Sequence, residues 1–244
     1  MKNIEIVITM GGLGKRFLDA GYKAPKYMIE AKGKSLFEWS MISLTGFKAD
    51  TNQYIFIALK DDSSDIEQFI KEKCLTLGIL NYKIILLEHL TDGQATTAME
   101  AAKYWDSDHP LLIYNIDTYV EAGEMKSEEL RGDGFIPCFK APGNHWSFVR
   151  TDPMTGLAVE IKEKERISDH CTLGAYYFKS CGLYARLYEE YYSDNKNLVK
   201  GEKYVAPLYN HLLTKGGQIY ISNVDPSKVH VLGTPEELRT FLGG

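Results

Sequence analysis

The feature that most constrains the fold is a regular alternation of strand-like and helix-like segments over about the first 115 residues. Apolar runs rich in β-branched and aromatic residues occupy residues 4–9, 54–59, 82–87 and 111–114. Helical patterns lie between them, at residues 35–44, at residues 64–77 and from about Thr96 onward. At the start of the second helix, Ser64 and Glu67 predict a capping box. Because strands of nearly continuous apolar character are covered on both faces, this order predicts a parallel sheet with right-handed crossovers and a ligand at the carboxyl ends of the strands.

The second half of the chain has more strands and fewer helices. Strand-like runs separated by turns occupy residues 134–139, 147–150, 157–161 and 172–178. We expect them to be antiparallel additions to one edge of the same sheet. Helical patterns return at residues 182–192 and 205–213, followed by a strand at residues 218–222. A last helix opens at Thr234, which can cap it, and Glu237 can close a capping box. No linker or repeat interrupts the pattern, so a single domain over residues 1–244 is expected.

Composition and charge exclude several classes of protein. Hydrophobic residues make up 44% of the chain, which suffices for a large core. The formal net charge is −5 at pH 7, and an acidic chain has little general affinity for nucleic acid or anionic membranes, so neither is an expected partner. The sequence has no secretory signal and no run long enough to span a membrane. Four cysteines without a CxxC pair are typical of a reducing compartment, so a cytoplasmic location is expected.

A glycine-rich segment follows the first strand and carries the strongest local signal. It comprises Met10, Gly11, Gly12, Leu13, Gly14, Lys15 and Arg16, and Pro25 and Lys26 follow. Glycines at the end of a strand let backbone amides approach a phosphate, while Lys and Arg supply charge. The Walker pattern does not fit, because Arg16 follows Lys15, and GxGxxG does not fit, because Phe17 stands where its last glycine belongs. The alternative is a tight turn with solvated cations.

This segment resembles the GGxGxR signature, followed by PK, of the sugar-phosphate nucleotidyltransferase family. Further matches in the same order are residues 92–97, 115–117, 163–164, 174–178 and 233–238. The resemblance implies a three-layer α/β/α, Rossmann-like fold of the glycosyltransferase-A type with a mixed, mainly parallel sheet. It implies that a nucleoside triphosphate and a phosphorylated small-molecule acceptor, such as a sugar 1-phosphate, react with Mg²⁺ as cofactor and release pyrophosphate. Short bacterial members serve capsule or lipopolysaccharide biosynthesis. Residues 1–120 would bind the nucleotide and residues 121–244 the acceptor.

Asp117 is the candidate catalytic and metal-binding carboxylate. It follows an apolar strand, where a carboxylate is costly unless it is paired or functional, although a turn or capping role is the plain alternative. By the resemblance, Asp117 binds Mg²⁺, Lys26 contacts the reacting phosphates and Arg16 contacts the departing pyrophosphate. Fixed cations at these places would stabilise charge that develops in the transition state.

The second metal ligand departs from the family pattern. Many members carry an Asp two residues before the glycine that matches Gly233, but Val231 stands there. Asp225 is the nearest substitute as a metal ligand. An Asp that precedes a proline is also an ordinary turn residue, so both interpretations stay open.

The acceptor-side residues are implied by the resemblance alone. Glu163 would bind a sugar hydroxyl and Lys164 the phosphate of the acceptor. Further candidates for this side are Trp146, Gly174 and Tyr176. The run from Lys162 to Arg166 is equally typical of an exposed strand end with mixed charges, and Trp146 would also suit a core or an interface.

Two segments are expected to form the base pocket. These are Met10 to Gly12 and residues 88–93, which include Glu88 and Gly93. A carboxylate accepts hydrogen bonds but cannot donate them, and cytosine offers an amino group where thymine and uracil offer a carbonyl. Glu88 therefore favours CTP over dTTP or UTP, unless its side chain points into solvent.

Other classes of protein remain open. A glycosyltransferase on a related fold needs a metal-binding DxD, but Thr118 and Tyr119 follow Asp117. A non-catalytic nucleotide-sugar binding protein would explain Val231, and an NAD-linked oxidoreductase would need glycine in place of Phe17. Tyrosines clustered at residues 184–192 fit either the self-interface of a homo-oligomer or a core helix.

Overall fold

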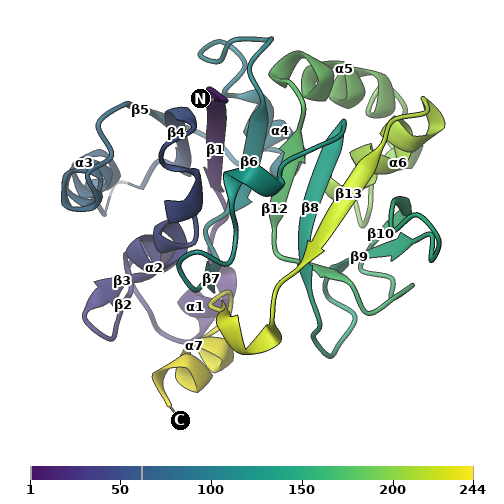
Figure 1. The fold of residues 1–244 in the computed structure, drawn as a ribbon. Helices are drawn as coiled ribbons and strands as arrows, with labels where there is room; N and C mark the ends of the chain where they lie inside the picture. The colour runs from purple at the N-terminus through teal and green to yellow at the C-terminus, as the bar shows by residue number, and fades with distance from the viewer. Residues whose placement is uncertain (1, 62, 244) are drawn as a thin grey trace.

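The centre of the computed structural model, which describes residues 2–61 and 63–243, is a mixed, mainly parallel sheet (Figure 1). Its strands are β1 (Ile4–Met10), β4 (Thr51–Leu59), β5 (Tyr82–Leu87), β6 (Leu111–Asn115), β8 (Gly134–Phe139), β9 (Ser147–Thr151), β10 (Ala158–Glu163), β11 (Cys171–Thr172), β12 (Ala175–Phe178) and β13 (Ile219–Asn223). Their order is β10-β9-β11-β8-β12-β6-β1-β4-β5, and β13 pairs with β8. The expected strands of the first half are confirmed.

Helices cover both faces of this sheet. They are α1 (Lys15–Asp19), α2 (Leu36–Ile42), α3 (Ile66–Leu77), α4 (Gln94–Met99), α5 (Cys181–Tyr191), α6 (Ala206–Thr214) and α7 (Pro235–Leu242). Because neighbouring residues of a strand face opposite ways, β1 contributes side chains to two hydrophobic cores, one on each face of the sheet. Ile6 packs with Phe37 of α2 and Ile70 of α3, whereas Val7 packs with Ala98 of α4 and with side chains of α5 and α6. The three-layer α/β/α architecture is therefore confirmed.

The pairing of the strands changes direction at β12. The strands β1, β4, β5 and β6 are mutually parallel, whereas β12 runs antiparallel to both β6 and β8. The expected antiparallel additions are confirmed, but β13 pairs in parallel with β8. The single strand expected at residues 172–178 is interrupted at Gly174, which has a φ of +74°. A Cβ there would lie 2.7 Å from Asn115 Nδ2, so only glycine brings the chain this close to β6.

The capping box predicted at the start of α3 does not form. The predicted box of Ser64 and Glu67 is wrong, because Asp65 caps α3 and its carboxylate accepts a hydrogen bond from Gln68 N at 2.9 Å. Asp65 stands one residue closer to the apolar pattern, and an Asp caps as well as a Ser. Short 3₁₀ turns occur at Lys26–Met28, Thr45–Phe47, Ser127–Glu129, Asn195–Asn197 and Pro226–Lys228.

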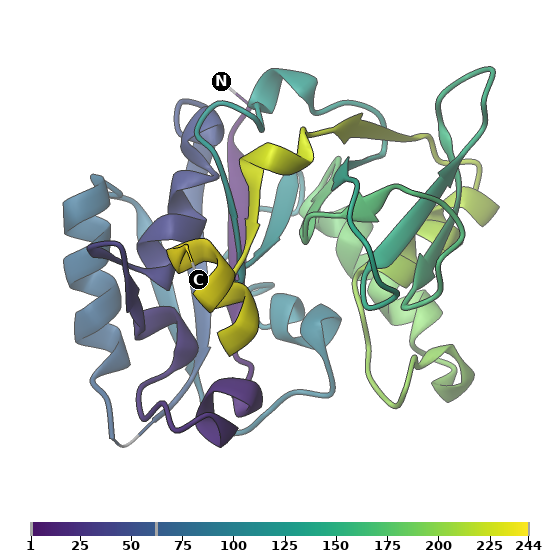
Figure 2. The same ribbon diagram turned by 90° about the horizontal axis from the view of Figure 1, so that it is seen from below.

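Two small sheets lie beside the main one. One pairs β2 (Glu30–Ala31) with β3 (Lys34–Ser35), and the other pairs β7 (Thr118–Val120) with β14 (Val229–Val231). The second sheet returns the carboxyl-terminal segment to the end of β6. Figure 2 shows α7 beside α1, and the two helices share a small core in which Phe17 and Leu238 are buried. Residues far apart in the sequence thus meet at the carboxyl ends of the parallel strands.

The tyrosines of α5 pack inward. Tyr184 is fully buried and donates a hydrogen bond to Ala95 O, while Tyr188 and Tyr191 pack against the same core. The core-helix interpretation therefore accounts for these side chains within one chain. Among residues 2–61 and 63–243, no helix has both the length and the apolar character needed to cross a membrane.

Candidate functional site

A cavity of about 630 Å³ opens where β1 and β6 end. The predicted site residues that line it are Met10, Gly11, Gly12, Leu13, Gly14, Arg16, Lys26, Gly93, Asp117, Trp146, Glu163, Lys164, Gly174 and Tyr176. Residues predicted for the nucleotide side and for the acceptor side therefore share one cavity. Its place agrees with the rule that ligands of such sheets bind at the carboxyl ends of the strands.

The glycine-rich segment combines close packing with open space. A Cβ on Gly11 would lie 3.5 Å from Leu87 Cδ1, at the end of β5, whereas a Cβ on Gly12 would meet nothing within 4 Å. Gly14 precedes α1 in the left-handed conformation, with a φ of +60°, and its α-carbon packs near the stem of Lys26. The loop is thus fixed by its neighbours at Gly11 and Gly14 but presents bare backbone to the cavity at Gly12.

Lys26 and Asp117 form an ion pair within the cavity. Lys26 Nζ lies 3.3 Å from Asp117 Oδ2, and the side chains are 18% and 37% exposed. The backbone of Asp117 is held in place, because its carbonyl accepts a hydrogen bond from Leu232 N at 2.8 Å. A partly exposed ion pair of this kind contributes little to stability. Its consequence for the site is that a cation and a carboxylate lie side by side in the cavity.

An amide network lies behind this pair. Gln94 Nε2 donates a hydrogen bond to Asn115 Oδ1, and Thr9 Oγ1 lies 3.4 Å from the same oxygen. All three residues line the cavity. Asn115 and Gln94 belong to matched sequence segments, but the sequence analysis assigned neither of them a role.

The part of the cavity predicted to bind the acceptor contains a buried carboxylate. Only 6% of the Glu163 side chain is exposed, and Ser147 Oγ donates a hydrogen bond to Glu163 Oε2. The Tyr176 hydroxyl lies 3.2 Å from Ser147 Oγ and 3.0 Å from Thr172 Oγ1. Burial raises the pKa of Glu163, and the hydrogen bond from Ser147 offsets part of this effect. The exposed-strand alternative therefore does not describe Glu163.

Lys164 faces the same cavity through an unusual backbone conformation. Successive side chains of a strand normally point to opposite faces. Lys164 follows β10 with a φ of +58°, and its Nζ contacts both the hydroxyl and the ring face of Tyr204, 4.2 Å from the ring centroid. Lys164 Nζ also lies 4.0 Å from Glu163 Oε1. The left-handed conformation thus brings two consecutive charged side chains to one site.

Trp146 lines the same part of the cavity. Its indole donates a hydrogen bond to Pro142 O at 2.9 Å, and its ring packs edge-on against Phe139. The His145 ring also lies against the indole, with ring centroids 4.3 Å apart. Trp146 therefore both packs against the core and lines the cavity.

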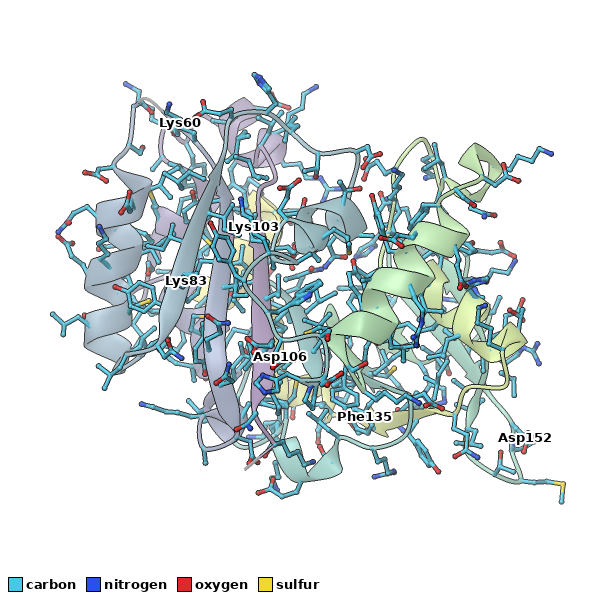
Figure 3. All side chains as sticks on the ribbon, turned by 90° about the horizontal axis from the view of Figure 1, so that it is seen from above. Lys60, Lys83, Lys103, Asp106, Phe135 and Asp152 are labelled. Atoms are coloured by element: carbon cyan, nitrogen blue, oxygen red, sulfur yellow. The ribbon has the colours of Figure 1, made fainter. Side chains whose placement is uncertain are left out.

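Three predicted residues do not line the cavity. Glu88 follows β5 and has a side chain that is 68% exposed and 3.3 Å from Nζ of Lys60, which is labelled in Figure 3. Asp225 is exposed, and its carboxylate accepts a hydrogen bond from Ser227 N, as in an ordinary turn. Lys15 begins α1 and is exposed. The structure therefore does not bring Asp225 to Asp117.

Several lining residues were missed by the sequence analysis. Besides Gln94 and Asn115, they include Ser147, Glu202, Tyr204 and Glu237. Ser147 adjoins the predicted Trp146, and Glu237 was assigned only to a helix cap. No local pattern marks Glu202 and Tyr204, because long-range contacts place them: Lys203 N donates to Asp92 O, and Ala95 N donates to Lys203 O.

Comparison with known proteins was made on sequence and on structure. No protein-family model and no curated protein matches the chain. The crystal structure of the nucleoside-diphosphate-sugar pyrophosphorylase from Vibrio cholerae RC9 is 35% identical over 98% of this chain and 100% of that chain, with a TM-score of 0.89. The inositol-1-phosphate CTP transferase from T. maritima is 14% identical over 96% of this chain and 91% of that chain, with a TM-score of 0.74, a likeness of fold.

Proposed function

Since the chain belongs to the sugar-phosphate nucleotidyltransferase family, we propose that it transfers a nucleotidyl group from a nucleoside triphosphate to a phosphorylated small molecule and releases pyrophosphate. One observation carries the proposal. The open backbone at Gly12, the Lys26 and Asp117 pair, and the Glu163 and Lys164 pair line a single cavity. In this proposal residues 1–120 hold the nucleotide and residues 121–244 hold the acceptor.

The chemistry proposed is an in-line displacement at the α-phosphorus. An oxygen of the acceptor phosphate forms the new P–O bond, and the bond to pyrophosphate breaks, with its electron pair leaving on the pyrophosphate. Lys164 holds the acceptor phosphate, Lys26 the reacting phosphates and Arg16 the leaving group. Fixed cations stabilise this transition state more than the ground state. The reason is that negative charge spreads over the oxygens of the transferred group and builds up on the leaving pyrophosphate as the bond between them breaks.

No enzyme nucleophile takes part in this mechanism. The four cysteines are buried, and burial raises the pKa of each of their thiols. None of them lines the cavity. A buried thiol with a raised pKa is a poor nucleophile, since the thiolate is the reactive form.

The residues at the cavity fit a magnesium ion in their chemistry. Mg²⁺ prefers oxygen ligands and is commonly held by one or two carboxylates together with substrate phosphates. Asp117 offers such a carboxylate, 37% exposed, at the end of β6. When bound, the ion would neutralise charge on the phosphates of the nucleotide. Lys26 is positioned beside Asp117 to bind the same phosphates.

The finer part of the proposal concerns the base. We place CTP first, with dTTP and UTP as alternatives. Glu88 follows Leu87, whose side chain packs at Gly11, but its own carboxylate is 68% exposed, pairs with Lys60 and does not line the cavity, so it would have to turn inward to meet the base. Its pair with Lys60 is exposed on both sides, and such pairs contribute about 0–1 kcal/mol, so a cytosine amino group can compete for the carboxylate. A surface-glycan pathway, such as capsule or lipopolysaccharide assembly, and a cytoplasmic location belong to this proposal.

The proposed function is tested by measuring pyrophosphate release. The protein is incubated with Mg²⁺, each of CTP, UTP, dTTP, ATP and GTP, and a panel of sugar 1-phosphates and other phosphorylated metabolites. We expect release that depends on both substrates and is largest with CTP. Release of a nucleoside diphosphate from a nucleotide-sugar donor, with no pyrophosphate, would instead identify a glycosyltransferase.

The acceptor affinity is expected to depend on Glu163. Because its pKa is raised, Glu163 becomes neutral at a higher pH than an ordinary carboxyl group. A neutral carboxyl group accepts hydroxyl hydrogen bonds more weakly, so the KM of the acceptor should rise as the pH falls through this raised pKa. Glu163→Gln should raise this KM about 10-fold, as expected for the loss of a charged hydrogen bond, and flatten its dependence on pH. Steady-state kinetics across pH would measure both effects.

Glu165→Gln is the matched control for this prediction. Glu165 lies two residues away, and its side chain is 66% exposed. The pH dependence of the acceptor KM should be the same in this variant as in the wild type. If Glu163→Gln kept the wild-type profile, Glu163 would not be the group that titrates.

A further inference from the structure

Glu237 has an incomplete capping role at the start of α7. Thr234 Oγ1 accepts a hydrogen bond from Glu237 N at 3.2 Å, which is the first half of a capping box. In α2, by contrast, both halves form, because Ser35 N donates to Glu38 Oε2 at 2.8 Å. Glu237 Oε2 is buried and has no hydrogen-bond partner in the part of the chain that the structure describes. The carboxylate is therefore not used for the cap.

The unpaired oxygen and the Asp117 carboxylate lie beside the same glycine. A Cβ on Gly233 would lie 3.5 Å from Glu237 Oε2 and 3.7 Å from Asp117 Oδ2, so the two carboxylates flank the same bare glycine. Asp117, Gly233 and Glu237 all line the cavity. The pairing of Val231 with Thr118 and the hydrogen bond from Leu232 N to Asp117 O hold the two segments together. These backbone contacts hold in place the segments from which the Asp117 and Glu237 side chains extend.

A buried carboxylate oxygen without a partner is costly, and a cation removes that cost. Acidic residues in the first turn of a helix are favourable in general, but this effect does not require the oxygen to be buried. Glu236, in the same turn, is exposed. A positively charged ligand between Glu237 and Asp117 would supply the partner that the buried oxygen lacks.

We propose that Glu237 is the second carboxylate ligand of the divalent cation at Asp117. This inference rests on the proposed function, which supplies the reason for a cation at this place. Val231 lines the cavity where many family members carry an Asp, and the carboxylate that is missing there is supplied from one turn inside α7. Asp225 is not needed for this site, since its carboxylate already accepts a hydrogen bond from Ser227 N.

The test is the binding of Mn²⁺ alone, measured by the electron paramagnetic resonance signal of the free ion, without nucleotide or acceptor. We expect Glu237→Gln to weaken Mn²⁺ binding at least about 10-fold, because a charged ligand is replaced by a weaker neutral one. Glu236→Gln makes the same change of charge in the same helical turn and should bind Mn²⁺ as the wild type does. Asp117→Asn should lose affinity together with Glu237→Gln.

A second variant restores the site in a different way. In the Glu237→Gln background, Val231→Asp places a carboxylate at the position that family members use, and Mn²⁺ affinity should return. Thermal unfolding checks the fold of each variant: Mn²⁺ should raise the Tm of the wild type and of the double variant but not that of Glu237→Gln.

The outcomes separate this inference from the proposed function. If Glu237→Gln binds Mn²⁺ as tightly as Glu236→Gln does while Asp117→Asn is weakened, the role of Glu237 is overturned and the nucleotidyltransferase proposal stands. If the wild type binds no Mn²⁺, the inference is also overturned. Pyrophosphate release, measured separately in the wild type, decides the function.

Discussion

Replacement of Asp117 by Asn is expected to lower the rate of pyrophosphate formation by about 10³-fold, the largest loss that we predict for any single side chain. Asn keeps the size of the side chain and can still accept a hydrogen bond from Lys26 Nζ, which lies 3.3 Å from Asp117 Oδ2. It removes the negative charge, so the side chain becomes a weaker ligand for a divalent cation. Single-turnover kinetics with saturating nucleotide and acceptor would measure the chemical step apart from binding.

The matched control for this variant is Asp152→Asn. Asp152, labelled near one edge of the molecule in Figure 3, is partly exposed and accepts a hydrogen bond from Thr155 N in a turn outside the cavity. Its rate should equal that of the wild type. A loss of less than about 10-fold in Asp117→Asn, with Mg²⁺ present, would show that Asp117 does not hold the metal during the reaction.

The parallel strands and the glycine-rich segment were predictable because their signals are local. Strands buried on both faces must be apolar throughout, so residues 111–114 stand out in the sequence and match the buried part of β6. In the same way, a glycine-rich turn at the end of a strand can be recognised from the local sequence, without knowledge of distant residues. The structure places Gly11 and Gly12 at the end of β1, as their position after an apolar run predicts.

The limits of sequence reasoning appear at the charged residues. Residue type and sequence position made Glu88 and Asp225 candidates, but their side chains have partners that the sequence does not reveal. Lys60 comes from the end of the neighbouring strand, and Ser227 N lies in a 3₁₀ turn. Glu237 is the opposite case, a lining residue that the sequence analysis did not propose for the site. The cap at Thr234 was predicted correctly, and Glu237 was assigned only to that cap although it lines the cavity.

The backbone conformation of Lys164 was equally beyond the sequence. A φ of +58° at a residue other than glycine is uncommon and depends on surrounding contacts. Here the contact of Lys164 with Tyr204 comes from forty residues further along the chain. The sequence predicted the pair of charges at Glu163 and Lys164, whereas tertiary contacts decide that both face one cavity.

The same tertiary contacts make Gly93→Ala the most damaging substitution for stability that we predict. Gly93 has a φ of +143°, a conformation essentially restricted to glycine, and a Cβ would lie 2.6 Å from Lys203 N and still closer to Lys203 O. Both backbone groups are already used, in hydrogen bonds with Asp92 O and Ala95 N. Strain, overlap and the loss of these bonds together should cost about 4 kcal/mol, which lowers Tm by roughly 10 °C in a chain of this size.

Gly12→Ala distinguishes this effect from a general consequence of adding a methyl group. A Cβ on Gly12 meets nothing within 4 Å, so its Tm should stay within about 2 °C of the wild type, while the KM of the nucleotide rises because the methyl group enters the cavity. Gly93→Ala should lower Tm and also weaken acceptor binding, since Lys203 lies between the cavity residues Glu202 and Tyr204. Calorimetric unfolding of both variants measures the difference. Equal Tm values would mean that the segment around Lys203 moves away from Gly93 at little cost, and that the two sides of the cavity are not held together at this contact.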